Sequence, residues 1–452
     1  MVYMKNKFKK LLPIIKGFAF CGIALQIVLG ILYMAGNMMT VPEFWETTIY
    51  AEIAEQFVLD EYMTYLYPML VKVVKFLPII NYQIIIYILQ IAAGAFCVYK
   101  IATGWTDNKN AAVVVALWVN TLPFVAQAHT TVLPHSFVFT LLAIAVSIVA
   151  KATYEKTAIP LRDWSYLLLG FTLIAQLDKS YFVVALLLLI WAVGLQIYQQ
   201  NKKVLSVLAG FLACVVVVAS NIGVYQVTQT KGYYGRMQRS PEAFLFQRVG
   251  MGIMTEDLIY YMPEEVKETF TGKELETLKK YPYQVQRTFG STLEARFGKE
   301  RANEIYLELG LWGLENTTKE TIYAVVADTL DYAFPMARVS TWELDGSHGA
   351  TSWNYQQFSA NHPRLSAFYI HSSQFLWGIG IVAGLIVGII ALFTKHRKCV
   401  GLILLVIVYM LIYGFAFAIR GTGMYDYKLA LLPMALLQVP GCYCCIHYFK
   451  KQ

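Results

Sequence analysis

Apolar residues in this sequence fall in runs of about 20 residues, and such runs restrict the folds open to the chain. A soluble core draws its apolar residues from short periodic patterns, whereas a run of this length matches the thickness of a lipid bilayer. Hydrophobic residues make up 57% of the 452 residues and charged residues only 15%, which favours the same conclusion. We therefore predict an all-α polytopic membrane protein with ten membrane-spanning helices, near residues 11-35, 81-102, 111-128, 136-152, 165-177, 181-198, 204-226, 371-393, 400-419 and 428-446.

The first and the fifth of these runs differ from the others. The run at 11-35 is too long for the core of a signal peptide and lacks a convincing cleavage site, so we expect it to remain as a span. The run at 165-177 is short for a bilayer. We expect a tilted or half-inserted helix there, continuing through Leu177-Asp178-Lys179-Ser180 into the next span.

Lysine and arginine in the connecting loops indicate the orientation. With the N-terminus inside, 17 of these residues lie in cytoplasmic segments and five in short outer loops. Because positive charge concentrates on the cytoplasmic side, we expect a multi-pass protein of a bacterial plasma membrane with both termini cytoplasmic. The net charge of +8 then reflects membrane topology, so membrane lipids are expected partners and nucleic acid is not.

This topology divides the chain into three parts. Residues 1-226 form a transmembrane module with a first outer loop at 37-80, and residues 371-452 form a second transmembrane module. Between them, residues 227-370 carry 18 of the 29 acidic and 15 of the 37 basic residues, which predicts an extracytoplasmic domain. Apolar residues at helical spacing predict that this domain is mainly helical, with helices at 241-251, 263-280, 283-297, 299-314 and 318-332.

The first outer loop contains an acidic stretch at 41-70. Its apolar residues recur every four positions, which predicts an amphipathic helix lying on the membrane surface with Glu52 and Glu55 on its polar side. Glu46 lies at the start of this helix, where a carboxylate suits a general base acting on a lipid-linked substrate. The alternative is that these acids only keep a surface helix solvated. The stretch has six carboxylates, at Glu43, Glu46, Glu52, Glu55, Asp60 and Glu61.

Four residues of this loop follow a family pattern: Glu46, then Tyr50, then Ala54, and later Tyr67-Pro68. In this pattern the chain resembles the GT-C superfamily of polytopic glycosyltransferases, of the protein mannosyltransferase and aminoarabinose transferase type. The resemblance implies a GT-C fold and a polyprenyl-phosphate-linked sugar donor used on the outer side of the membrane. It also implies that Glu46 is catalytic, supported by neighbours such as Glu43 and Tyr50.

Two further segments are similar to the same family. GFTLIAQLDKSYFVVALL, from Gly170 to Leu187, resembles a Gly-rich span that ends in a lysine, here Lys179. RGTGMYDYKLALLPM begins at Arg420 and resembles the family's arginine and tyrosine before a span, with Tyr427 as support. The resemblance implies that Arg420 and Lys179 bind the lipid phosphate, a role that suits a guanidinium well. The alternatives are a snorkelling lysine and an ordinary boundary arginine.

The outer loop AHTTVLPHSF lies where family members often carry a second acidic residue. His129 and His135 take its place here. An imidazole can act as an acid or base near neutral pH, so we predict a catalytic role for His135 and support from His129, with a purely structural role as the alternative. A divalent metal cofactor remains open, because no ligand motif indicates one.

These observations together predict a membrane glycosyltransferase that moves a sugar to an envelope polysaccharide, lipid or protein, with inversion at the anomeric carbon. In this hypothesis Glu46 deprotonates the acceptor. Two alternatives stay open: a transporter or flippase for lipid-linked saccharides, and a non-enzymatic envelope scaffold. A flippase needs a polar path through the bilayer, whereas the spans here hold almost no internal charge.

Overall fold

The computed structural model describes the protein over part of its length. The described residues are 2–40, 45–56, 66–77, 81–104, 108–155, 157–178, 181–198, 204–230, 242, 245–246, 261–268, 272–273, 290–333, 364–365, 368–369, 372 and 415.

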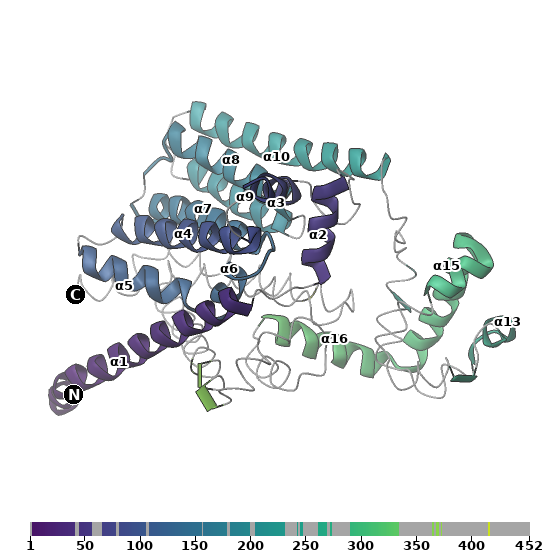
Figure 1. Cartoon of the computed structure of the whole chain (residues 1–452), viewed down its shortest axis with the longest axis horizontal. Helices are drawn as coiled ribbons and strands as arrows, with labels where there is room; N and C mark the ends of the chain where they lie inside the picture. The colour runs from purple at the N-terminus through teal and green to yellow at the C-terminus, as the bar shows by residue number, and fades with distance from the viewer. Residues whose placement is uncertain are drawn as a thin grey trace. The chain divides into compact units, whose positions relative to one another are not determined.

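All regular secondary structure in these residues is helical, as the sequence predicts (Figure 1). In the described part, α1 to α10 follow one another between residues 2 and 230, and α15 and α16 cover most of residues 290–333. The helices are α1 Val2–Thr40, α2 Trp45–Gln56, α3 Leu66–Lys75, α4 Tyr82–Thr103, α5 Lys109–Asn120, α6 Pro123–His129, α7 His135–Glu155, α8 Leu161–Leu177, α9 Phe182–Tyr198, α10 Val204–Thr230, α13 Glu264–Lys267, α15 Gly290–Asn316 and α16 Thr318–Ala333.

The chain divides into two compact units. The first comprises Met1–Tyr234, Met336–Val406 and Leu431–Gln452, and the second comprises Gly235–Pro335 and Ile407–Ala430. The sequence instead places the boundaries of the outer domain at 227 and 370, so the second unit begins later and its main segment ends earlier than that domain.

Among the described residues, two helical segments are long and apolar enough to cross a bilayer, Phe20–Met38 in α1 and Tyr82–Thr103 in α4. They match the first two predicted spans, at 11-35 and 81-102. Helices α7, α9 and α10 coincide with three more predicted spans and contain shorter apolar stretches, His135–Val149, Ala185–Tyr198 and Val207–Ser220. The predicted spans at 371-393, 400-419 and 428-446 lie outside the described residues.

The span predicted at 111-128 is not one continuous helix. Helix α5 ends at Asn120, and α6 begins at Pro123. Proline cannot donate a backbone hydrogen bond and favours the first position of a new helix, while Thr121 donates its hydroxyl back to the Leu117 carbonyl at 2.8 Å. The 12 residues of α5 rise about 18 Å, which is short of a bilayer core of about 30 Å. One continuous helix over 111-128 is therefore not formed, and α5 and α6 divide this run between them.

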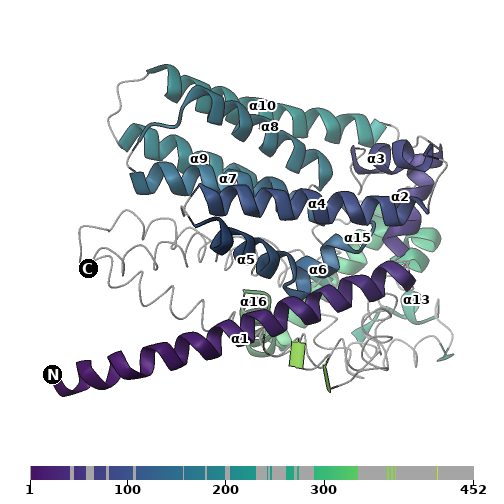
Figure 2. The ribbon, with the colours of Figure 1, turned by 60° about the vertical axis from the view of Figure 1, so that its left-hand side comes forward.

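The helices of the first unit pack side by side. Helix α4 packs on α5 and α7, α7 packs on α8, and α10 packs on α8 and α9. Figure 2 shows α4, α7, α8, α9 and α10 running alongside one another, with α5 and α6 as separate ribbons. Short loops join consecutive helices, so the end of one helix lies beside the start of the next.

The interior of this unit holds a set of polar side chains beside its apolar core, and large apolar side chains are also exposed on its surface. The buried polar residues include Gln26, Asn37, Gln90, Asn120, Gln127, His129, Thr130, Ser136, Thr140 and Gln196. Large apolar residues are exposed on several helices, among them Phe20, Val28, Ile31, Leu32, Ile88, Phe96, Leu169, Ile190, Ile197, Leu208, Phe211 and Leu212. A surface this rich in apolar side chains indicates contact with an apolar partner rather than with water.

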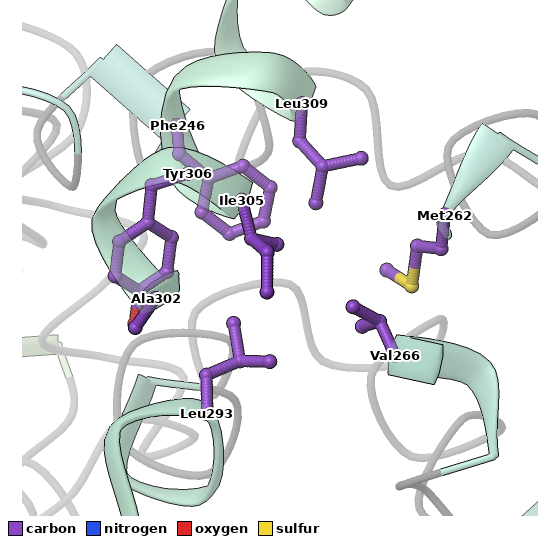
Figure 3. Packing of buried hydrophobic residues seen from close by; sticks show 8 residues of the cluster. All are labelled: Phe246, Met262, Val266, Leu293, Ala302, Ile305, Tyr306 and Leu309. Atoms are coloured by element: carbon purple, nitrogen blue, oxygen red, sulfur yellow. The ribbon is translucent and has the colours of Figure 1, made fainter. Parts of the chain in front are cut away.

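The second unit has a conventional hydrophobic core. The side chains of Phe246, Met262, Val266, Leu293, Ala302, Ile305, Tyr306 and Leu309 are buried against one another (Figure 3). Phe246 and Tyr306 stack with ring centroids 5.5 Å apart. Helix α15 supplies most of the cluster, and its course changes at Gly298, whose φ of 78° and ψ of 164° are non-helical. This change confirms the predicted boundary between helices at 283-297 and 299-314, and α16 confirms the helix predicted at 318-332.

Candidate functional site

Helices α2 and α3 bring together the residues of the first family pattern. The side chains of Tyr50, Ala54 and Tyr67 are buried, and the rings of Tyr50 and Tyr67 meet edge to face with centroids 5.2 Å apart. Such aromatic contacts add about 0.5 to 1.5 kcal/mol beyond area burial. Glu46 lies in the first turn of α2, one turn before Tyr50, and its backbone alone is described.

The polar side of α2 is exposed, as predicted for Glu52 and Glu55. Glu55 pairs with Lys75 near the end of α3, with Oε1 and Nζ 2.7 Å apart. The hydrogen bond from Lys75 lowers the pKa of the Glu55 carboxyl below its ordinary value. Because both side chains are accessible to water, this pair adds little to stability.

The buried face of α3 connects this pair of helices to the turn between α6 and α7. The hydroxyl of Tyr67 donates to Oε1 of Gln90 in α4 at 3.0 Å. Nε2 of Gln90 lies 3.1, 2.9 and 2.9 Å from the backbone carbonyls of Ala128, His129 and Thr131. Carbonyls at a helix end have no partner within the helix, so this amide supplies the donors that the end of α6 requires. Glutamine at position 90 therefore fixes where α6 ends.

His129 closes the same turn from inside. It is fully buried, its Nε2 lies 2.7 Å from Oδ1 of Asn120, and its Nδ1 lies 2.7 Å from Oγ of Ser136. Asn120 donates Nδ2 to the Ala116 carbonyl at 2.7 Å, which assigns its Oδ1 as an acceptor. The hydrogen of His129 therefore lies on Nε2, and Nδ1 accepts from Ser136. Burial lowers the pKa of this imidazole to about 3, so the ring is neutral at physiological pH.

Two more side chains hold the interrupted segment. Nδ2 of Asn37, near the end of α1, donates to Oγ1 of Thr130 at 2.8 Å. The hydroxyl of Tyr369 donates to the Thr121 carbonyl at 2.6 Å. Buried backbone and side-chain polar groups need hydrogen-bond partners, and here other protein groups supply them.

Directly after this turn, the structure pairs His135 with an aspartate. His135 is the first residue of α7, and Asp178 is the C-cap of α8. Nε2 of His135 lies 3.4 Å from Oδ2 of Asp178, and the two side chains are 19% and 14% exposed. The ring of Tyr181 lies beside His135, with centroids 6.5 Å apart. An imidazole next to a carboxylate, partly open to the surroundings, is the arrangement that orients histidine for proton transfer.

Asp178 was not among the site residues predicted from the sequence. Family members often carry a second acidic residue in the loop that here contains His129 and His135, whereas the carboxylate that meets His135 lies between α8 and α9. The available signal was the placement of Asp178 in the short connection between two apolar runs, where charge is costly unless it is paired or solvated. Asp178 and His135 are 43 positions apart, so the sequence gives no local sign that they are paired.

The other predicted site residues are not all placed. Glu43, Lys179, Arg420 and Tyr427 lie outside the described residues, so their predicted roles stay predictions. Lys179 directly follows Asp178 in the sequence. Within the described ranges, no group of three or more His, Cys, Asp or Glu side chains is arranged to hold a metal ion.

Comparison of this chain with protein-family models, with curated proteins and with solved structures finds no match. The function is therefore inferred from the residues and contacts of the chain itself.

Proposed function

We propose that the protein is a multi-pass membrane glycosyltransferase of the GT-C type. It takes a sugar from a polyprenyl-phosphate carrier and transfers it to an envelope polysaccharide, lipid or protein on the outer face. The proposal retains ten membrane spans, the third of them divided between α5 and α6, with both termini in the cytoplasm. The exposed apolar side chains of the first unit support membrane insertion, and the excess of lysine and arginine in the predicted inner segments supports the orientation.

One observation supports this proposal more than any other: the family pattern and the histidine–aspartate pair belong to one connected set of contacts. The ring of Tyr50 contacts Tyr67, and Tyr67 donates to Gln90. Gln90 holds the α6–α7 turn, which leads directly into His135. The helix that carries Glu46 and the helix that carries His135 are thus linked through contacts of buried side chains, as a preorganised site requires.

In the proposed reaction the donor phosphate is held by Arg420 and Lys179, and the acceptor is bound by Glu46 and His135. One of these last two groups takes the proton of the acceptor hydroxyl as its oxygen attacks the anomeric carbon. Fixed positive charge stabilises the departing phosphate. A direct displacement of this kind inverts the configuration at the anomeric carbon.

A flippase for lipid-linked saccharides is the second candidate, because the break between α5 and α6 is a feature that transporters use at their binding sites. Here, however, the Thr121 carbonyl at the break accepts from Tyr369, and polar groups at the end of α6 accept from Gln90 and Asn37. The buried polar side chains of the described part are uncharged. This favours a rigid support over a substrate path. Lipid translocation without a transfer product, in vesicles containing the purified protein, would reverse the order.

The test is transfer from a panel of radiolabelled polyprenyl-phosphate hexoses in membranes that contain the protein. We expect Glu46→Gln to abolish transfer, because the amide cannot accept a proton or bind the acceptor as a carboxylate does. Glu52→Gln is the matched control, because Glu52 is an exposed carboxylate on the same helix. Transfer by Glu46→Gln at the wild-type rate, at equal expression, would remove Glu46 from the mechanism.

A further inference from the structure

The contact between His135 and Asp178 involves one of the two ring nitrogens of His135. Nε2 faces Oδ2 of Asp178 at 3.4 Å. A carboxylate accepts hydrogen bonds and does not donate them, so this contact favours the neutral ring that carries its hydrogen on Nε2. Nδ1 then carries the lone pair and is the atom that can accept a proton.

The backbone that carries this imidazole is held in place. His135 follows a turn of five residues in which Thr130 and Thr131 are tied to Asn37 and Gln90. The hydroxyl of Ser136, next to His135, donates to the buried ring of His129. On the other side, the backbone N–H of Tyr181 donates to the Asp178 carbonyl at 3.2 Å, which ties the carboxylate-bearing residue to the start of α9. Both members of the pair are therefore positioned before any substrate binds.

His129 and His135 differ in the contacts that their two ring nitrogens make. Both ring nitrogens of His129 are engaged by buried protein groups, and that ring is closed to solvent. His135 is partly exposed, and its pairing with Asp178 occupies Nε2 alone. His129 is therefore suited to stabilising the fold, whereas His135 is suited to proton transfer.

We infer that Asp178 is a positioning residue that fixes the tautomer of His135, and that Nδ1 of His135 accepts the proton of the acceptor hydroxyl. This inference rests on the proposed function and assigns the proton to His135, leaving Glu46 to bind the acceptor. As the hydroxyl proton moves to Nδ1, the acceptor oxygen bonds to the anomeric carbon. The bond from that carbon to the phosphate oxygen breaks, and its electron pair leaves with polyprenyl phosphate. The imidazolium, stabilised by Asp178, later releases its proton to water.

The first experiment does not depend on transfer. Purified protein in detergent is treated with diethyl pyrocarbonate, which modifies unprotonated imidazole nitrogens, and each histidine peptide is quantified by mass spectrometry. We expect modification of His135 and protection of His129, which serves as an internal control. Asp178→Ala should slow modification of His135 about tenfold, because the carboxylate orients the ring. Added formate should restore the rate, whereas the same concentration of chloride should not.

The second experiment measures transfer in the same variants with the hexose donor panel. We expect His135→Ala and Asp178→Ala each to lose about 100-fold or more, the range of general acid–base catalysis. Imidazole should partly restore the first variant and formate the second. Asp163→Asn is the matched control on α8, because Asp163 lies at the opposite end of the helix and pairs with Arg162. A residue needed only for folding would not be rescued by a small molecule.

The outcomes separate the two proposals. If the wild type transfers no sugar but His135 responds to Asp178→Ala and to formate, the proposed function fails and the tautomer assignment stands. If the modification rate of His135 is unchanged or faster in Asp178→Ala, the positioning role is overturned whatever the transfer assay shows. If transfer persists in His135→Ala, the proton-accepting role is overturned while the proposed function remains.

Discussion

Gly94 in α4 is the position where one added carbon should do the most damage. A Cβ built on Gly94 would lie 2.6 Å from Oδ1 of Asn120, 2.6 Å from Cε1 of His129 and 2.8 Å from Nε2 of His129. These two side chains share the 2.7 Å hydrogen bond that closes the interior of the α6–α7 turn. Helix α4 therefore approaches this buried pair so closely that only glycine fits.

The size of the effect of Gly94→Ala follows from three contributions. Forcing the neighbours apart costs about 1 to 3 kcal/mol, as for other overpacked cores. Separating His129 from Asn120 leaves two buried polar groups poorly paired, at a further cost of about 1 to 3 kcal/mol. Alanine recovers at most about 1 kcal/mol through its higher helix propensity. We expect a net loss of about 3 kcal/mol in the free energy of unfolding.

The measurement is thermal unfolding of the full chain in detergent, followed by intrinsic fluorescence and by loss of the folded peak in size-exclusion chromatography. A loss of this size should lower the unfolding midpoint by about 5 °C or more. Gly194→Ala in α9 is the matched control, because a Cβ there meets nothing within 4 Å. It should leave the midpoint unchanged or raise it slightly. Equal midpoints for Gly94→Ala and wild type would refute the close approach of α4 to the His129–Asn120 pair.

Two further predictions concern pH and backbone conformation. Because the pKa of His129 is about 3 in the folded protein and about 6.5 in an unfolded chain, the unfolded state alone binds a proton between these values. The free energy of unfolding should therefore fall by about 1.4 kcal/mol per pH unit as the pH drops below 6.5. In His129→Gln, unfolding midpoints measured from pH 7 to 5 should depend less on pH. Identical slopes in the variant and the wild type would contradict this prediction. Gly298→Ala should cost about 1 to 3 kcal/mol, since φ of 78° with ψ of 164° is nearly closed to other residues. Hydrogen exchange of α15 in the full chain should accelerate in this variant and not in Gly272→Ala, where a Cβ meets nothing within 4 Å.

Helix bounds could be predicted from the sequence where the signal lies within the helix's own residues. The apolar run at 81-102 predicts α4 to within a residue at each end, and the helical spacing at 318-332 predicts α16 equally well. The separation of two helices near Gly298 was also readable, because a residue without Cβ lies between two periodic segments. In each case the information lies within one turn or one run.

The break between α5 and α6 was missed because two local signals conflict. The run at 111-128 is mostly apolar, whereas Pro123 opposes a continuous helix. Tyr369 donates to the Thr121 carbonyl at the break, and Gln90 and Asn37 hold the end of α6 that follows it. These partners lie far away in the sequence, so periodicity within the run gives no sign of them.

The candidate site shows the same limit. His135 was singled out by its place in an outer loop, and that inference needed only the order of the spans. Its pairing with Asp178 depends on how α7 and α8 pack, which a single sequence does not state. The roles predicted for Glu46 and Arg420 came from a short pattern, and no contact of their side chains is described.

The hydrogen bond from Tyr369 to the Thr121 carbonyl also constrains how the protein is made. The two residues are 248 positions apart. At synthesis rates of about 5 to 20 residues per second, the carbonyl exists for roughly 12 to 50 s before its donor is translated. During that interval the α5–α6 segment must be held by Asn37 and Gln90, which are already synthesised, or shielded by the insertion machinery. Chains truncated before residue 369 should therefore insert with this segment accessible to protease, and extension past Tyr369 should protect it.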